Sequence, residues 1–210
     1  DGILIRTFSH QMVLDMARYA TVPVVNMLTD FNHPCQIISD LLTIYEKLGN
    51  IENFKVAYLG DCNNVTNSWL NLAARIPLDL RIATAPETLP DMDLVNNIKK
   101  IGVSKIKVTQ SVKEAIDGAE VLYTDVWASM GEKDKIHERE RVLKEFQINS
   151  SLLKYAEKKT IIMHCLPADR DKEITDEVIE GNHSVVFDQA ENRLHAQKAI
   201  LVQLDKWSSS

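Results

Sequence analysis

The stretch TIIMHCLPA at residues 160–168 is the most informative part of the sequence for the fold. Its first four residues are apolar or β-branched, as in a buried parallel strand, and Pro167 ends that strand. An imidazole and a thiol, from His164 and Cys165, therefore follow directly at the carboxyl end of a strand. Ligands bind at this edge in open α/β sheets. Buried strands also end in Cys and Pro for structural reasons, so the stretch alone leaves both interpretations open.

The rest of the chain alternates short apolar runs with helical patterns. We expect strands at residues 54–59, 80–83, 106–108, 121–124, 160–163 and 184–187. We expect helices at residues 67–76, 91–101, 111–118, 138–146 and 150–156. This alternation predicts an α/β fold with a doubly wound parallel sheet and helices on both faces. Right-handed crossovers place the loops that follow the strands along one edge of that sheet.

The two flanks do not follow the alternation. Residues 1–49 hold predicted strands at 3–5 and 22–25 and helices at 9–19 and 34–48, with too little apolar surface for a separate core. We therefore expect residues 1–49 to be the end of a second α/β domain, including an interdomain helix. Residues 52–188 form the main domain. Residues 189–210 hold a closing helix, predicted at 191–207, that returns to the first domain, and a tail.

Composition excludes several classes of function. The 210 residues carry a net charge of −6 and 45% hydrophobic residues, which is typical of a soluble globular protein and disfavours nucleic acid as a partner. No apolar run approaches the length of a membrane span, and no signal-peptide pattern is present. The three cysteines are odd in number and widely separated, which indicates a reducing compartment such as the cytoplasm. They lack zinc spacing, so no metal site is expected.

A polar pentapeptide, NHPCQ at residues 32–36, opens the long N-terminal helix. Pro34 suits the first helical position, which places His33 at the cap and Gln36 in the first turn. Free N–H groups and the helix dipole at this end favour partial negative charge, as on a polarised carbonyl or a phosphate. Alternatively, Gln36 closes a capping box by reaching back to the cap.

Asparagines follow the predicted strand 54–59, in the stretch GDCNNVTNS at residues 60–68. A dinucleotide fingerprint needs three spaced glycines here, and only Gly60 is present, so NAD is disfavoured. Asparagine amides both donate and accept hydrogen bonds, which suits the carboxylate of an amino acid. A turn with a helix cap is the structural alternative, and we favour it for Asn63.

A carboxylate follows the predicted strand 121–124, in the stretch DVWASMG at residues 125–131. Asp125 is placed to pair with a substrate ammonium, and Ser129 adds a hydroxyl in a loop that Gly131 allows to bend. The structural alternative is that Asp125 caps a helix while Trp127 fills the core. Arg6 and Arg193 offer donors for phosphate or a developing oxyanion, although surface ion pairs are the commoner role of a lone arginine.

Together these segments resemble the ornithine carbamoyltransferases of the aspartate/ornithine carbamoyltransferase family. The matching motifs are Asp1-Gly2-x-x-x-Arg6, His33-Pro34-x-Gln36, Asn63-Asn64, Asp125-x-Trp127-x-Ser129-Met130-Gly131, His164-Cys165-Leu166-Pro167 and Glu191-Asn192-Arg193. The second and last are shared with other carbamoyltransferases, whereas the Ser-Met-Gly loop combined with His-Cys-Leu-Pro is more specific for ornithine. The resemblance implies a Rossmann-like ornithine-binding domain and carbamoyl transfer from carbamoyl phosphate to the side-chain amine of L-ornithine, giving citrulline and phosphate.

The resemblance also implies the roles of individual residues. Carbamoyl phosphate would be bound by Arg6, His33, Gln36, Cys165, Leu166 and Arg193. Ornithine would be bound by Asn64, Asp125, Ser129, Met130 and Cys165. Arg6, His33, Cys165 and Arg193 would act in catalysis, with Cys165 orienting the amine rather than attacking as a nucleophile. No cofactor or metal is implied, and the family functions as trimers or multiples of trimers in arginine metabolism.

One departure from the family pattern limits what this chain is expected to do. The family's Ser-Thr-Arg-Thr-Arg phosphate motif is absent from the sequence, as if the front of the first domain were missing. We therefore expect this chain to have little activity by itself. The alternatives are a carbamoyltransferase for another amine such as putrescine, a non-catalytic amino-acid-binding fragment, and a thiol hydrolase that uses Cys165.

Overall fold

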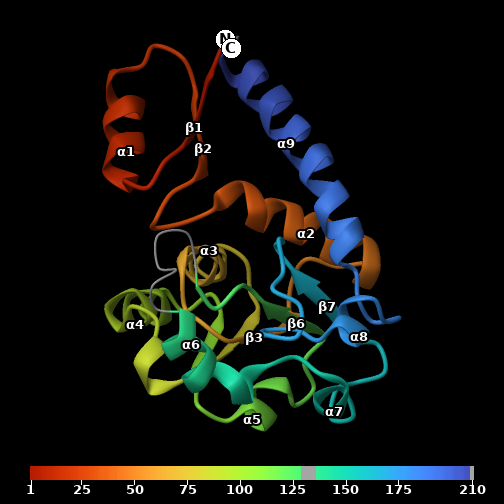
Figure 1. The fold of residues 1–210 in the computed structure, drawn as a ribbon. Helices are drawn as coiled ribbons and strands as arrows, with labels where there is room; N and C mark the ends of the chain where they lie inside the picture. Colours follow the sequence, from red (N-terminus) through yellow and green to blue (C-terminus); the bar gives the residue numbers. More distant parts are fainter. Residues whose placement is uncertain (129–135, 209–210) are drawn as a thin grey trace.

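A five-stranded parallel sheet forms the centre of the molecule (Figure 1), in a computed structural model that describes residues 1–128 and 136–208. The strand order is β5-β4-β3-β6-β7, and every neighbouring pair is parallel. The strands are β3 (Lys55–Leu59), β4 (Asp79–Ala83), β5 (Lys105–Thr109), β6 (Val121–Thr124) and β7 (Ile161–His164). The predicted doubly wound α/β fold is confirmed.

Helices cover both faces of this sheet. They are α3 (Asn64–Ala73), α4 (Met92–Ile101), α5 (Val112–Ile116), α6 (Ile136–Leu143), α7 (Ser150–Leu153) and α8 (Asp176–Ile179), with 3-10 turns at Pro86–Thr88 and Lys144–Phe146. Alternate residues of β3 belong to separate hydrophobic clusters: Val56 and Tyr58 pack in one, Ala57 and Leu59 in the other. This alternation follows from the pleat of a strand that is buried on both faces.

The N-terminal elements lie outside the five-stranded sheet. They are β1 (Ile3–Arg6), α1 (His10–Tyr19), β2 (Val24–Leu28) and α2 (Pro34–Leu48), with β1 parallel to β2. Ile37 and Ile44 of α2 belong to the same cluster as Val56, so α2 packs on the main sheet. The last helix, α9 (Val186–Ser208), runs beside α2 toward β1 and β2 (Figure 1). No helix in the described ranges is long and apolar enough to cross a bilayer.

The expected strand at residues 184–187 is wrong. Ser184 makes only an isolated bridge with Ile162, and α9 begins at Val186, five residues before the predicted start of the closing helix. Buried residues there recur at helical spacing, because Gln189 and Asn192 are buried as well as Val185, whereas Phe187 is 57% exposed. Two of these buried residues are polar, so the sequence shows no helical period of apolar residues there, and the valines at residues 185–186 indicated a strand instead.

Among the other boundaries that differ from the predictions, two have a clear physical reason. Helix α3 begins at Asn64 rather than residue 67, because Asn63 forms a complete capping box with Thr66. Strand β2 spans Val24–Leu28 rather than residues 22–25, since Pro23 supplies only its carbonyl to the ladder, which bonds the Ile3 amide at 2.9 Å.

Candidate functional site

The candidate site lies where the strand order of the sheet reverses. From β3 the chain moves outward through β4 and β5, then crosses to the other side of β3 for β6 and β7. The carboxyl ends of β3 and β6 therefore diverge into a crevice, which is where ligands bind in sheets of this kind. Asn63 and Asn64 follow β3, Asp125 follows β6, and Cys165 follows β7.

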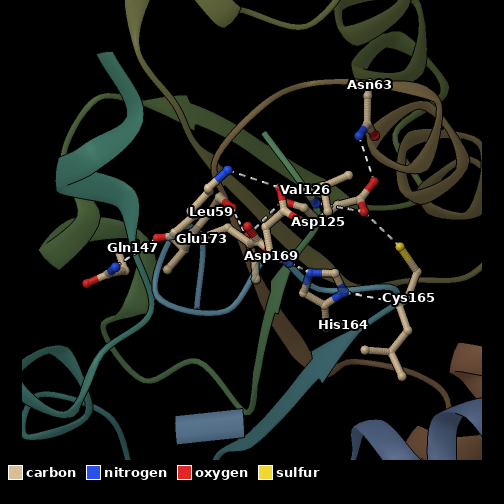
Figure 2. A network of polar contacts seen from close by, with 12 residues as sticks. Leu59, Asn63, Asp125, Val126, Gln147, His164, Cys165, Asp169 and Glu173 are labelled. Carbon is tan, nitrogen blue, oxygen red and sulfur yellow. Dashed lines mark hydrogen bonds and ion pairs between the residues drawn. The ribbon is translucent and has the colours of Figure 1, made fainter. Parts of the chain in front are cut away.

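The Asp125 carboxylate joins these three strand ends (Figure 2). Its Oδ2 accepts a hydrogen bond from Asn63 Nδ2 at 2.7 Å, and its Oδ1 accepts one from Cys165 Sγ at 3.0 Å. The Val126 amide also donates to Oδ1, at 2.8 Å. Asp125 therefore binds neighbouring strand ends instead of capping a helix. Trp127 is buried in the core, as the structural alternative for it predicted.

Trp127 also explains the glycine at the end of β3. Gly60 has a φ of +117°, and a Cβ built on it would lie 3.0 Å from the Trp127 Nε1 atom. A larger residue would strain the backbone and displace the indole. Gly60 is thus required by the backbone turn and by the packing of the Trp127 indole, and not by the binding of a nucleotide phosphate.

The Cys165 thiol is held in its protonated form. Burial raises the pKa of this thiol well above its usual value, and the Asp125 carboxylate raises it further. A protonated thiol is a hydrogen-bond donor and a poor nucleophile at neutral pH. The residue as a whole is partly exposed.

His164 is fully buried and stabilises the loop that follows β7. Its Nδ1 accepts from the Leu166 amide at 2.9 Å, so Nε2 carries the proton and donates to Glu173 Oε1 at 3.0 Å. Leu166 has a φ of +54°, an uncommon conformation for a residue other than glycine. The imidazole therefore holds this backbone and has no free nitrogen to activate Cys165, which disfavours a thiol hydrolase.

The same contacts bear on metal binding. Asp125, His164 and Cys165 have potential ligand atoms within 4.8 Å of one another. Both ring nitrogens of His164 are already hydrogen bonded, so a metal ion would have to break one of those bonds. This arrangement suits a polar ligand better than a metal ion.

The amino end of α2 lies against the first turns of α3. The His33 amide donates to Ser68 Oγ at 2.7 Å, and that hydroxyl donates to the Asn64 carbonyl, also at 2.7 Å. Asn64 Nδ2 in turn donates to the Thr29 carbonyl at 2.8 Å. These bonds connect the β2–α2 loop to the end of β3, so the two parts of the predicted site are adjacent.

Two buried polar atoms at this end of α2 have no hydrogen-bond partner among the described residues: His33 Nδ1 and Gln36 Oε1. The expected alternative of a capping box is wrong, because Gln36 Nε2 donates to Asp40 Oδ1 at 2.9 Å and His33 makes no side-chain cap. Buried polar atoms are nearly always paired in folded proteins. Unpaired ones beside a helix amino end therefore indicate a place for a polar ligand.

Positive charge gathers around His33. Burial lowers the pKa of this imidazole, and the charges of Arg193 and then Arg6 add to the effect, so that the pKa is about 4. His33 is therefore neutral at pH 7. Arg6 ends β1, Arg193 lies on α9 and His33 opens α2, so three elements bring nitrogen donors to one region. Ser129 and Met130 lie outside the described residues.

Sequence reasoning missed some polar residues of this region. Asn63 was expected to be a cap alone, but it caps α3 and also binds Asp125. Asp40, Glu173 and Gln189 were not singled out, although each is at most 1% exposed. A signal was available for Asp40, since it lies one helical turn after Gln36 on the face of α2 that also holds apolar Ile44.

Comparisons with known proteins agree with this geometry. The model described as "Aspartate/ornithine carbamoyltransferase, Asp/Orn binding domain" matches residues 52–204, and the model of the carbamoyl-P binding domain of the same family matches residues 1–46. The chain belongs to the aspartate/ornithine carbamoyltransferase family. The expected resemblance is confirmed.

Individual family members are similar along nearly the whole chain. "Ornithine carbamoyltransferase, chloroplastic" of Pisum sativum is 50% identical over 204 residues, which are 97% of this chain and 54% of the relative. Ornithine carbamoyltransferase of Syntrophus aciditrophicus is 50% identical over 201 residues, 96% of this chain and 67% of the relative. The chain thus spans about half to two thirds of the length of these relatives.

Solved structures share the fold. Ornithine carbamoyltransferase from Pyrococcus furiosus matches with a TM-score of 0.88 and 45% identity, over 96% of this chain and 65% of that one. The anabolic enzyme from Campylobacter jejuni matches with a TM-score of 0.92 and 34% identity, over 99% and 70%.

Proposed function

We propose that this chain supplies the ornithine site and part of the carbamoyl phosphate site of an ornithine carbamoyltransferase. The observation that carries the proposal is the Asp125 carboxylate, which joins the ends of three strands beside the unpaired atoms of His33 and Gln36. The reaction transfers the carbamoyl group to the side-chain amine of L-ornithine, giving L-citrulline and phosphate. The names of the similar proteins support this choice of substrate.

The amino end of α2 would hold the carbamoyl group. When a neutral amine attacks the carbamoyl carbon, negative charge builds on the carbonyl oxygen and then on the leaving phosphate. Neutral His33 would donate one N–H to that oxygen, and Arg6 and Arg193 would offset the charge. Donors aimed at developing charge are worth about 3 kcal/mol each in enzymes that have been tested by substitution.

The strand ends would hold ornithine. The Asp125 carboxylate suits an ammonium group, and the amide of Asn64, with Ser129 and Met130, would bind the remaining α-group. The protonated thiol of Cys165 would orient the reacting amine. The Leu166 carbonyl would accept a hydrogen bond from an N–H of the reactants. No covalent intermediate with the enzyme is needed, because the amine attacks the carbamoyl carbon directly.

We also propose a division into residues 1–49, 52–188 and 189–210, and assembly as a trimer. We place the protein in arginine metabolism and in the cytoplasm, with no nucleic acid, membrane or metal as partner. The three free cysteines support a reducing compartment. The pea relative carries the word chloroplastic in its name, so organelles are part of the range within the family.

Calorimetric titration of the chain with ornithine, with and without carbamoyl phosphate, tests the proposal. We expect ornithine to bind more tightly when carbamoyl phosphate is present, because the two sites are adjacent. Norvaline, which keeps the α-groups of ornithine and lacks the amine, should compete, whereas putrescine should not. Ornithine binding that ignores carbamoyl phosphate would indicate a non-catalytic binding fragment, and preference for putrescine would indicate another carbamoyltransferase.

A further inference from the structure

A buried carboxylate that the proposed chemistry does not use lies where α2, α9 and β6 meet. Asp40 is 0% exposed. Its Oδ1 accepts from Gln36 Nε2 at 2.9 Å and from Gln189 Nε2 at 2.7 Å, and its Oδ2 accepts from the Tyr123 hydroxyl at 2.9 Å. Three donors from three elements thus converge on one side chain, as an ionised carboxylate requires.

The first of these bonds decides which end of the Gln36 amide is available to a ligand. Because Nε2 donates to Asp40, the amide oxygen Oε1 points elsewhere, and it is buried without a partner among the described residues. The opposite orientation would put an oxygen against the carboxylate. Asp40 therefore fixes Gln36 as an acceptor, which suits an N–H donor such as the amide nitrogen of a carbamoyl group.

The second bond reaches the other half of the site. Gln189 gives its Nε2 to Asp40, so its Oε1 is free to accept the His164 amide, at 2.9 Å. His164 immediately precedes Cys165, the residue that donates to Asp125. One carboxylate thus controls two glutamine orientations, one facing the carbamoyl region and one holding the end of β7.

We propose that Asp40 is a positioning residue shared by both halves of the site, acting through Gln36 on the carbamoyl group and through Gln189 on the backbone at His164. This inference rests on the proposed function for the identity of the ligand, but not for the hydrogen-bond geometry. Burial raises the pKa of Asp40 to about 6, against the effect of the hydrogen bonds from Gln36, Gln189 and Tyr123. Burying a carboxylate costs free energy, so its presence at this position indicates a role in the site rather than in stability.

Three variants test the part of the proposal in which Asp40 acts through Gln36 on the carbamoyl group. Asp40→Leu removes the acceptor. Asp40→Asn can keep Oδ1 as acceptor for both glutamines while its amide donates to the Tyr123 oxygen. Thr43→Val, one turn further along α2, removes the Asn192–Thr43 bond between α2 and α9 and touches neither glutamine, so it is the matched control.

Carbamoyl phosphate affinity, measured by calorimetry on the folded chain, is the first readout. We expect Asp40→Leu to weaken binding about tenfold or more, as for the loss of a hydrogen bond that involves a charged group, with Asp40→Asn and Thr43→Val within about threefold of the wild type. Equal binding by Asp40→Leu and wild type would overturn the proposal, as would an equal loss in Thr43→Val, because the effect would then be structural.

Amide hydrogen exchange at His164 is the second readout and needs no ligand. Gln189→Met keeps the length of the side chain and removes its acceptor, and it serves even where Asp40→Leu does not fold. We expect exchange at His164 to quicken about tenfold in Gln189→Met and in Asp40→Leu but not in Thr43→Val. Unchanged exchange in Gln189→Met would refute the part of the proposal in which Asp40 acts through Gln189 on the backbone at His164. Failure of the wild type to bind carbamoyl phosphate would instead count against the proposed function.

Discussion

The two halves of the candidate site differ in how completely their polar groups are paired. At the strand ends, Asp125 accepts three hydrogen bonds within the protein. At the amino end of α2, His33 Nδ1 and Gln36 Oε1 are buried and unpaired among the described residues. The first half is thus built as part of the fold, whereas the second half keeps atoms available for a ligand. Substitutions should therefore affect stability and binding together in the first half and binding alone in the second.

The largest expected effect is that of Asp125→Ala. It leaves Asn63 Nδ2, the Val126 amide and the Cys165 thiol without their acceptor, so we expect the free energy of unfolding to fall by about 2–4 kcal/mol. Ornithine binding should be lost as well. Urea denaturation and calorimetry measure the two effects. An unchanged free energy of unfolding would contradict the proposed difference between the two halves, because the strand-end half would then not support the fold.

His33→Ala should separate binding from stability. The imidazole makes no side-chain cap, and its Nδ1 has no partner in the described structure, so we expect the free energy of unfolding at pH 7 to change by about 1 kcal/mol or less. For the ornithine carbamoyltransferase proposed above, citrulline formation should fall about a hundredfold, as for the loss of one donor to developing charge. A large loss of stability with normal turnover would reverse the roles of the two halves.

The same variant should change the dependence of stability on pH. The pKa of His33 is lowered from 6.5 to about 4 in the folded protein, so the unfolded chain binds more protons between these values. Wild-type stability contributed by this group therefore falls as pH falls from 6.5 to 4, by about 2 kcal/mol at pH 4.5. His33→Ala should remove this loss, so its stability relative to wild type should rise at acid pH, as urea denaturation at pH 4.5 and 7.5 can measure.

The pH dependence of stability contributed by Asp40 has the opposite sign to that of His33, so it provides an internal control. The pKa of Asp40 is raised from 3.8 to about 6, so the folded protein binds more protons than the unfolded chain in that interval, and this contribution to stability falls as pH rises. Asp40→Asn should remove that slope. If both variants changed the slope in the same direction, the assignment of the two groups would be wrong.

The smallest expected effect concerns the reactivity of Cys165. Burial and Asp125 raise the pKa of this thiol, so alkylation by iodoacetamide at pH 8 should be about tenfold slower than for a free thiol. Asp125→Asn should quicken it, because removal of the carboxylate charge lowers the pKa. Mass spectrometry of the Cys165 peptide gives the rates, with Cys35, which does not contact Asp125, as the control. Fast alkylation of the wild type would restore the thiol hydrolase as an alternative.

Local patterns predicted the sheet well and one element poorly. The apolar runs that became β3, β6 and β7 are continuous in sequence, so they identified buried strands without knowledge of the packing. The run at residues 184–187 has the same composition, yet it enters α9, because Gln189 and Asn192 are buried against α2. Their burial depends on partners almost 150 residues away, which no window of sequence contains.

The order of strands and helices in the sequence was sufficient to predict that the loops after the strands share one edge, and that Asp125, Cys165 and the Asn63–Asn64 pair follow those strands. Neighbouring residues encode strands, caps and turns, so their order places these side chains. The orientations of the Gln36 and Gln189 amides, and the effect of the Arg6 and Arg193 charges on His33, follow from the tertiary structure alone. These properties depend on the distances between α2, α9, β1 and β6, and such distances arise only when the core packs.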